Sequence, residues 1–298
     1  MQKDKSMHSN SSSPLFRRGL GGGFVELHIE EPVARIILNR PDCHNALILE
    51  MITELSDVLD EISGMEELLF VVLSGNGRSF CAGVDLNWFS GAEERSLEEN
   101  TAQYKQLADV LLKLFQLPQV TIANVHGNVF GGGIGLMAAC DFVLAEANTR
   151  FMFSEVKLGL LPATILPFVA KRLSVQNLRK WILTGNLFVA DEAHRIGLVE
   201  VVCNDGQLEN TLLEFIASFD LAAPSAVKMT KNMINQVANG KVGMTDTELT
   251  ATILAEAVLS PNGQIGIHAF LEKRKKPLSN LSPKGKGLGN TDSENLNK

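Results

Sequence analysis

The chain has 298 residues, 45% of them hydrophobic, and a formal net charge of -7, so it can form one or two domains around a large core. The negative charge argues against a nucleic-acid-binding surface over the whole protein, and no stretch approaches the ~20 apolar residues of a membrane span. The four cysteines form no C-x-x-C pair and have no histidine at ligand spacing, which argues against a disulfide framework and a metal site. We expect a soluble cytoplasmic protein.

Both ends of the chain are polar. Residues 1–23 carry Ser, Asn and Gly where a secretory signal would have an apolar run, and we interpret them as a flexible leader. Residues 277–298 are rich in Gly, Ser and Asn, which is typical of a disordered tail. The predicted domain organisation is therefore an α/β core over 24–205 and a helical region over 206–276 between these ends.

The first elements of the core follow from hydrophobic periodicity. Apolar residues alternate over 24–30 and 33–39, which predicts two strands. Apolar residues recur at helical spacing over 45–63, which predicts an amphipathic helix, and the short apolar run at 68–75 predicts a buried strand.

The next elements continue this alternation. Ser96 and Glu99 form a capping-box pattern that predicts the start of a helix, which ends near Pro118. The apolar run at 120–127 predicts another buried strand. Because strands alternate with helices, we expect an α/β core with a parallel or mixed sheet. After about residue 205 the strand pattern stops, and four helical segments follow: 207–219, 224–238, 245–259 and 262–276.

Three consecutive glycines, Gly131, Gly132 and Gly133, stand where the strand at 120–127 leads into a short apolar helix. Each glycine weakens a helix by roughly 1 kcal/mol relative to alanine, so something must need close access to this backbone. A second glycine-containing loop, GNGRSFCAGVDL, follows the strand at 68–75. Loops at the carboxyl ends of such strands form a ligand crevice, and one N–H from each loop would make an oxyanion hole. A tight turn or close helix packing is the alternative reading of the glycines.

Glu155 is the candidate acid–base residue. It follows a short apolar strand and stands between Phe153 and Val156, an environment that would raise its pKa by desolvation. The alternative is a solvated glutamate at a strand end. Near the C-terminal end, the basic run at 273–276 is either a solvated helix end or a contact for a phosphate-rich cofactor tail.

Six segments in order resemble the crotonase superfamily, the enoyl-CoA hydratases and isomerases. The resemblance covers about residues 24–276. The segments are LNRPDCHNAL, FCAGVDL, IANVHGNVFGGGIGLMAACD, FSEVKLGLLPA, LTGNLFVADEAHRIGLV and AFLEKRKKP. The resemblance implies a crotonase-like spiral of ββα units, closed by C-terminal helices that build a homotrimer, often doubled to a homohexamer. It also implies an acyl-CoA thioester as substrate and no cofactor beyond the coenzyme A that the substrate carries.

The resemblance also assigns roles to single residues. The oxyanion hole would be formed by the N–H groups of Val84 and Gly132, and Glu155 would be the catalytic carboxyl. Phe270 and Lys273 would close over the nucleotide end of CoA, often that of a neighbouring subunit. The residues implied to bind substrate or CoA are Arg40, Cys43, His44, Ala82, Asp85, Gly131, Gly133, Phe270 and Lys273.

The sequence departs from the family pattern at Gly135, where well-studied hydratases carry the first of two glutamates, and at Ala163, where a glycine is usual. A hydratase with one glutamate is favoured, because FSEVKLGLLPATILPFV is most similar to bacterial 3-methylglutaconyl-CoA hydratases of leucine degradation. A double-bond isomerase and a non-catalytic acyl-CoA-binding protein are the alternatives. A carboxylated acyl group would need a cation, for which the candidates are Lys157, Lys171 and Arg172.

Overall fold

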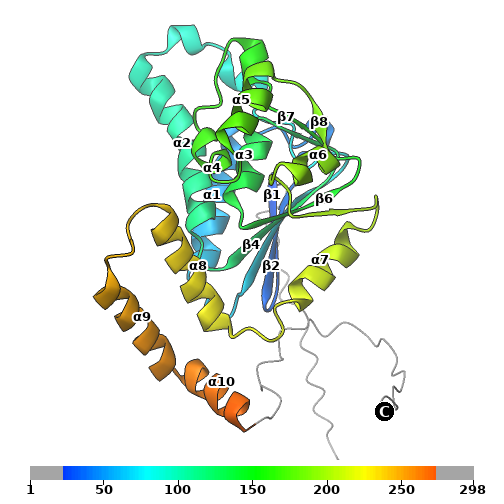
Figure 1. Cartoon of the computed structure of the whole chain (residues 1–298). Coiled ribbons are helices and arrows are strands. Elements are labelled where there is room, and N and C mark those ends of the chain that lie inside the picture. Colours follow the sequence, from blue (N-terminus) through cyan, green and yellow to red (C-terminus); the bar gives the residue numbers. More distant parts are fainter. Residues whose placement is uncertain (1–22, 273–298) are drawn as a thin grey trace, which may run out of the picture.

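The main sheet has six strands in the order β1-β2-β3-β4-β6-β9, in a computed structural model that describes residues 23–272 (Figure 1). The tail predicted at 277–298, Lys273 and all of the predicted leader except Gly23 lie outside the described residues. The strands are β1 (Val25–Glu30), β2 (Val33–Leu38), β3 (Phe70–Gly75), β4 (Val120–Val125), β6 (Phe142–Glu146) and β9 (Val201–Cys203).

Only the β1–β2 pair is antiparallel, and every other neighbouring pair in this sheet is parallel. The mixed sheet predicted from the sequence is therefore confirmed. All six residues of β4 are buried, as expected for a central strand of a parallel sheet that has helices on both faces. In such a sheet the carboxyl ends of β3 and β4 lie side by side, which brings the two glycine loops together.

Helix α1 (Leu49–Ser63) packs on β1 and β2, and α2 (Leu97–Gln116) packs against α1 and α3, each through an apolar stripe at helical spacing. The predicted capping box is confirmed: Ser96 Oγ accepts the Glu99 N–H at 3.1 Å, and the Glu99 carboxylate accepts the Ser96 N–H at 2.7 Å. On the opposite face, α7 (Leu208–Ala217) buries Leu208, Leu212 and Ile216 in a second, smaller core.

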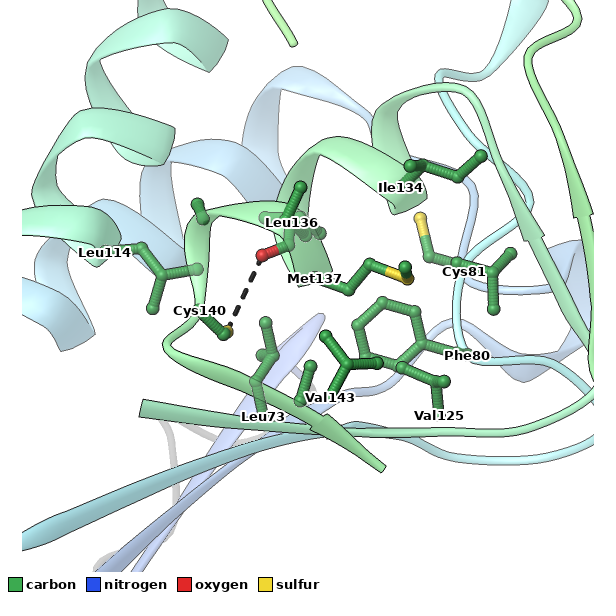
Figure 2. Close-up of a cluster of buried hydrophobic side chains, with 14 of the residues drawn as sticks. Leu73, Phe80, Cys81, Leu114, Val125, Ile134, Leu136, Met137, Cys140 and Val143 are labelled. Atoms are coloured by element: carbon green, nitrogen blue, oxygen red, sulfur yellow. Dashed lines mark hydrogen bonds between the residues drawn. The ribbon is translucent and has the colours of Figure 1, made fainter. Parts of the chain in front are cut away.

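Helix α3 (Gly132–Ala139) is buried on every side, and all eight of its residues are excluded from solvent. Figure 2 shows Ile134, Leu136 and Met137 of α3 among buried side chains of the neighbouring strands and helices. A helix that is apolar all round has a defined place only inside a core. The core therefore fixes the position of the α3 N-terminus, where the glycine triplet lies.

Three short strands form a second sheet, of which the sequence predicted only the strand before Glu155 and not the sheet. It pairs β5 (Asn128–Phe130) with β7 (Arg150–Met152) in parallel, and β7 with β8 (Phe188–Val189) antiparallel. Strands of two or three residues carry no readable alternation. The same region holds the short helices α4 (Leu166–Val169), α5 (Val175–Thr184) and α6 (Ala190–Arg195).

The predicted C-terminal helices are confirmed as α8 (Pro224–Ala238), α9 (Thr247–Leu259) and α10 (Pro261–Leu271). In Figure 1, α9 and α10 extend away from the main sheet. Their exposed large apolar side chains are Leu249, Leu254, Val258, Leu259, Ile265, Ile267, Phe270 and Leu271. Among the described helices, none combines the length and the hydropathy that a bilayer span needs.

Candidate active site

The candidate site lies where the loops after β3 and β4 meet the N-terminus of α3. The three consecutive glycines there are required for three different reasons. Gly131 has φ of +42°, and a Cβ on it would stand 3.0 Å from Glu155 Oε1. A Cβ on Gly132 would meet Leu47 and Val84 side-chain carbons at 3.2 and 3.3 Å. A Cβ on Gly133 would stand 2.4 Å from the Cys81 carbonyl oxygen, so Gly133 serves close packing of α3.

The N–H groups of Val84 and Gly132 face the same space. Leu47 bonds both neighbours of Val84: its N–H donates to the Gly83 carbonyl at 2.7 Å, and its carbonyl accepts the Asp85 N–H at 2.9 Å. In an extended segment bonded in this way, the N–H between these two points to the opposite side. Val84 N lies 3.7 Å from the Cβ position of Gly132. Within the described chain, neither of the two N–H groups has an acceptor.

Glu155 opens the 3₁₀ turn η4 (Glu155–Leu158) and brings a carboxyl group to the same space. Its Oε2 is buried and has no hydrogen-bond partner among the residues that the structure describes. Desolvation by burial raises the pKa of Glu155 above its ordinary value, as the apolar flanks in the sequence predict. An unpaired carboxyl with a raised pKa is better suited to accept and return protons than to hold a structure together.

Two cavities meet at these three groups. The first, which we call the Lys157 cavity, has a volume of about 370 Å³. The second, the Tyr104 cavity, has a volume of about 290 Å³ and aromatic and aliphatic walls. Both are lined by Val84, Phe89, Gly132, Glu155 and Leu160. A molecule that fills both cavities must therefore pass the two N–H groups and the carboxyl.

The walls of the Tyr104 cavity were not identified from the sequence. Trp88 and Phe89 come from the turn η2 (Leu86–Phe89), Tyr104 and Leu107 from α2, and Leu160 to Ile165 from the loop after η4. The rings of Trp88 and Phe89 each lie about 6 Å from that of Tyr104, at 6.0 and 5.8 Å between centroids. The unusual PATILP segment was the one signal in the sequence that pointed to this wall.

Only some of the residues implied to bind substrate or CoA line the two cavities. Ala82 and Gly131 line the Lys157 cavity, whereas Gly133 lines neither cavity. His44 has φ of +51°, and its Nδ1 lies 3.0 Å from Ser79 Oγ. Cys43 is exposed on the adjacent turn η1 (Pro41–Cys43).

Arg40 and Asp85 are ion-paired with each other: Arg40 Nη1 lies 2.7 Å from Asp85 Oδ2. Phe270 is 78% exposed on α10, and the residues around either cavity do not include it. A role for Phe270 over CoA would therefore need a second copy of the chain, as the resemblance implies.

The space beside Gly135 is filled by side chains from other parts of the chain. A Cβ there would stand 2.3 Å from Ile165 Cγ2 and 2.9 Å from Ile165 Cβ, with Leu111 Cδ1 at 3.4 Å. Ile165 is withdrawn from solvent and also lines the Tyr104 cavity, so a side chain at position 135 would have to push Ile165 toward that cavity. Packing therefore opposes a second glutamate at position 135.

Two of the three candidate cations are used elsewhere. Arg172 pairs with Glu200 at 2.8 Å and donates to backbone carbonyls, including that of Ala138 at the end of α3. Lys171 lines a separate cavity of about 730 Å³ between α2, α4 and α8, the largest described here, where none of the catalytic candidates lies. Lys157 lines the cavity named after it, beside Glu155. No group of three metal-ligating side chains occurs between residues 23 and 272.

The two N–H donors and the carboxyl together suit a reaction that forms an oxyanion next to a proton transfer. Two preorganised N–H donors stabilise an oxygen that gains negative charge, and each such donor contributes about 3–4 kcal/mol to a transition state. The N-terminus of α3 adds its positive dipole end at Gly132. A single carboxyl next to that oxygen can move a proton to or from a neighbouring carbon.

Comparison with known proteins identifies the family of the chain. The family model described as enoyl-CoA hydratase/isomerase matches residues 28–280. The chain is 34% identical over 259 residues to a short-chain-enoyl-CoA hydratase of Clostridium acetobutylicum, covering 84% of this chain and 95% of that protein. It is 28% identical over 256 residues to a 1,2-epoxyphenylacetyl-CoA isomerase of Escherichia coli, covering 84% and 96%.

Solved structures show the same fold. Pseudomonas aeruginosa AtuE superposes with a TM-score of 0.81 at 34% identity, covering 86% of this chain and 99% of that chain. An enoyl-CoA hydratase of Mycobacterium smegmatis superposes with a TM-score of 0.80 at 28% identity, covering 86% and 98%. The protein thus has the crotonase fold predicted from its sequence, and it belongs to the enoyl-CoA hydratase/isomerase family of enzymes.

Proposed function

We propose that this enzyme adds water across the α,β double bond of an enoyl-CoA thioester. The observation that carries the proposal is the meeting of the Val84 N–H, the Gly132 N–H and the Glu155 carboxyl where two cavities join. The thioester oxygen binds between the two N–H groups, the acyl chain enters the Tyr104 cavity, and the CoA arm leaves through the Lys157 cavity. The name of the Clostridium acetobutylicum relative supports hydration over other reactions of the family.

In this mechanism Glu155 begins as a carboxylate. It takes a proton from water while the water oxygen forms a bond to Cβ, and the electron pair of the double bond moves to the thioester as an enolate. The oxygen that gains the charge lies between Val84 and Gly132. The protonated carboxyl then gives its proton to Cα, so that one water is added and Glu155 returns to its starting state. A raised pKa makes the carboxylate a stronger base and keeps it protonated until it meets the enolate.

The water has one carboxyl partner here instead of two. Thr164 and Tyr104 line the cavity; the Tyr104 hydroxyl donates to Asn100 Oδ1 at 3.4 Å, so the Thr164 hydroxyl is the candidate to complete the hydrogen bonding of the water. The hydrogen bonding of the water differs here from that in a two-glutamate site, because Ile165 fills the space beside Gly135.

A double-bond isomerase is the second candidate. It is favoured by the lining of the Tyr104 cavity, whose one charged side chain among the described residues is Glu155. In this reaction the Glu155 carboxylate takes a proton from Cα of a 3-enoyl thioester and returns it to Cγ, with the same enolate oxygen between the same two N–H groups. The reaction needs one carboxyl and no water.

The proposed substrate of the hydratase is 3-methylglutaconyl-CoA, a branched acyl group with a distal carboxylate. Lys157 is the one of the three candidate cations that lines the site, since Lys171 and Arg172 have other partners; to meet it, the distal carboxylate must lie toward the Lys157 cavity, so for this substrate the acyl group does not extend into the Tyr104 cavity. Replacement of Lys157 by Met should then reduce kcat/KM for 3-methylglutaconyl-CoA at least tenfold and leave that for crotonyl-CoA within about twofold. Equal effects on both substrates would contradict this assignment.

We also propose that the chain assembles as a homotrimer or homohexamer through α8 to α10. The apolar side chains exposed on α9 and α10 support this, because a protein with a solvated surface rarely carries so many on neighbouring helices. Light scattering coupled to size exclusion gives the subunit number directly, and a monomeric mass would contradict the proposal.

The test of the activity is product analysis. The purified protein is incubated in H₂¹⁸O with 2-enoyl, 3-enoyl and 3-methylglutaconyl thioesters, and the products are separated and weighed by mass spectrometry. Gain of one labelled water supports the hydratase, and conversion of 3-enoyl to 2-enoyl without mass change supports the isomerase. Either activity should fall at least 10²-fold in Glu155→Gln, whose side chain is nearly isosteric. Binding without turnover of any thioester would indicate a non-catalytic acyl-CoA-binding protein.

A further inference from the structure

Asp85 stands next to Val84 in the loop after β3, and Arg40 stands in the loop after β2, which is bonded to that loop. Arg40 Nη1 lies 2.7 Å from Asp85 Oδ2 and also donates to the Ala46 carbonyl at 3.0 Å. Both side chains are largely withdrawn from solvent, with 21% and 13% of their surfaces exposed. A half-buried ion pair with geometry of this quality holds its loops more firmly than a surface pair does.

A continuous series of bonded residues links the Arg40–Asp85 pair to Val84. Ala46 is followed by Leu47, whose N–H and carbonyl bond the residues on either side of Val84 at 2.7 and 2.9 Å. Asp85 is the residue directly after Val84, and its Oδ1 accepts the Asn87 N–H at 3.0 Å. The Arg40 side chain therefore ties together both strands of the bridge that orients the Val84 N–H.

We propose that Arg40 and Asp85 are positioning residues for the oxyanion hole, acting through Leu47 on the direction of the Val84 N–H. This inference rests on the proposed function and assigns the pair a different role from the CoA contact that the sequence implied. Each charged group already has a partner within the protein, so the charge that Arg40 could offer a CoA phosphate is already balanced by Asp85. The pair gives orientation rather than substrate affinity.

The first measurement is the division of the effect between kcat and KM. Displacement of one oxyanion donor by a fraction of an ångström should reduce kcat about 10- to 100-fold, with KM changed less than about threefold. We expect this in Asp85→Asn and in Arg40→Met, and the double variant should lose no more than the worse single variant, because the two residues act as a unit. A tenfold rise in KM with kcat unchanged would identify a CoA contact and overturn the proposal.

The second measurement reports on the oxyanion hole without turnover. Butyryl-CoA labelled with ¹³C at its carbonyl has no double bond to react, and hydrogen bonds from Val84 and Gly132 lower the stretching frequency of the bound carbonyl. Infrared difference spectra should show this lowering in the unmodified protein and a smaller one in Asp85→Asn. Full lowering in the folded variants would overturn the positioning role, as would no lowering in the unmodified protein.

A matched control separates this role from general stability. Arg35→Met removes an arginine from an ion pair with Glu209, which is remote from both cavities. It should leave kcat and the carbonyl frequency unchanged. If Asp85→Asn does not fold, Arg40→Lys keeps the charge with a shorter reach and should show part of the kcat loss. The carbonyl readout is independent of turnover, so it tests the pair even if the panel of enoyl thioesters shows no activity and the proposed function fails.

Discussion

Gly135 allows the packing of the site to be tested with a single methyl group. In Gly135→Ala the new Cβ would stand 2.3 Å from Ile165 Cγ2, more than 1 Å inside the 3.5–4.0 Å at which carbon atoms normally touch. Ile165 is 2% exposed and can yield only toward the Tyr104 cavity, which it lines. Overpacking of this kind costs typically 1–3 kcal/mol, while alanine regains up to ~1 kcal/mol of helix propensity. We therefore expect a net loss of about 1–2 kcal/mol in the free energy of unfolding.

The assay is urea unfolding at fixed protein concentration, since the proposed assembly would make apparent stability depend on concentration. Gly64→Ala is the matched control, because Gly64 follows α1 with φ of -88° and has no atom within 4 Å of its Cβ position. It should change the unfolding free energy by less than about 0.5 kcal/mol. If Gly135→Ala has the same unfolding free energy as the unmodified protein, the packing argument is refuted. The explanation for the missing second glutamate then fails as well.

Other consequences follow from charge and burial. Burial raises the pKa of Glu155, so its ionised form destabilises the fold above that pKa and the penalty vanishes at low pH; melting curves of Glu155→Gln should show stabilisation at pH 8 and none at pH 4. Lys231→Met removes the partner of Asp141 at 2.6 Å and should cost about 1–3 kcal/mol in urea unfolding; a loss below 0.5 kcal/mol would contradict the pairing. Burial raises the pKa of Cys140 to about 12, whereas Cys43 is exposed, so mass-mapped alkylation of the native protein should label Cys43 and reach Cys140 only after unfolding; early labelling of Cys140 would contradict its burial.

Much of the fold could be read from the sequence because the signals are local. The capping box at Ser96, the apolar stripes of α1 and α2 and the buried runs of β3 and β4 are properties of neighbouring residues. Of the second sheet, only β7 could be read in this way, and β5 and β8 could not. They exist because β5 and β8 each pair with β7, and a two-residue strand has no stability apart from its partner.

The candidate site likewise has features that the sequence indicates and features that only the tertiary structure decides. The sequence pattern pointed to the two glycine loops and to Glu155, because loops at adjacent strand ends meet and a glutamate between apolar residues loses solvent, whereas Val84 and Gly132 were named through the family resemblance. Only the tertiary structure decided what surrounds them. Ile165, thirty residues further along the chain, fills the space beside Gly135, and the Arg172 side chain is taken up by backbone carbonyls. Packing and desolvation depend on which atoms become neighbours in space, and the spacing of residues along a single chain does not contain that information.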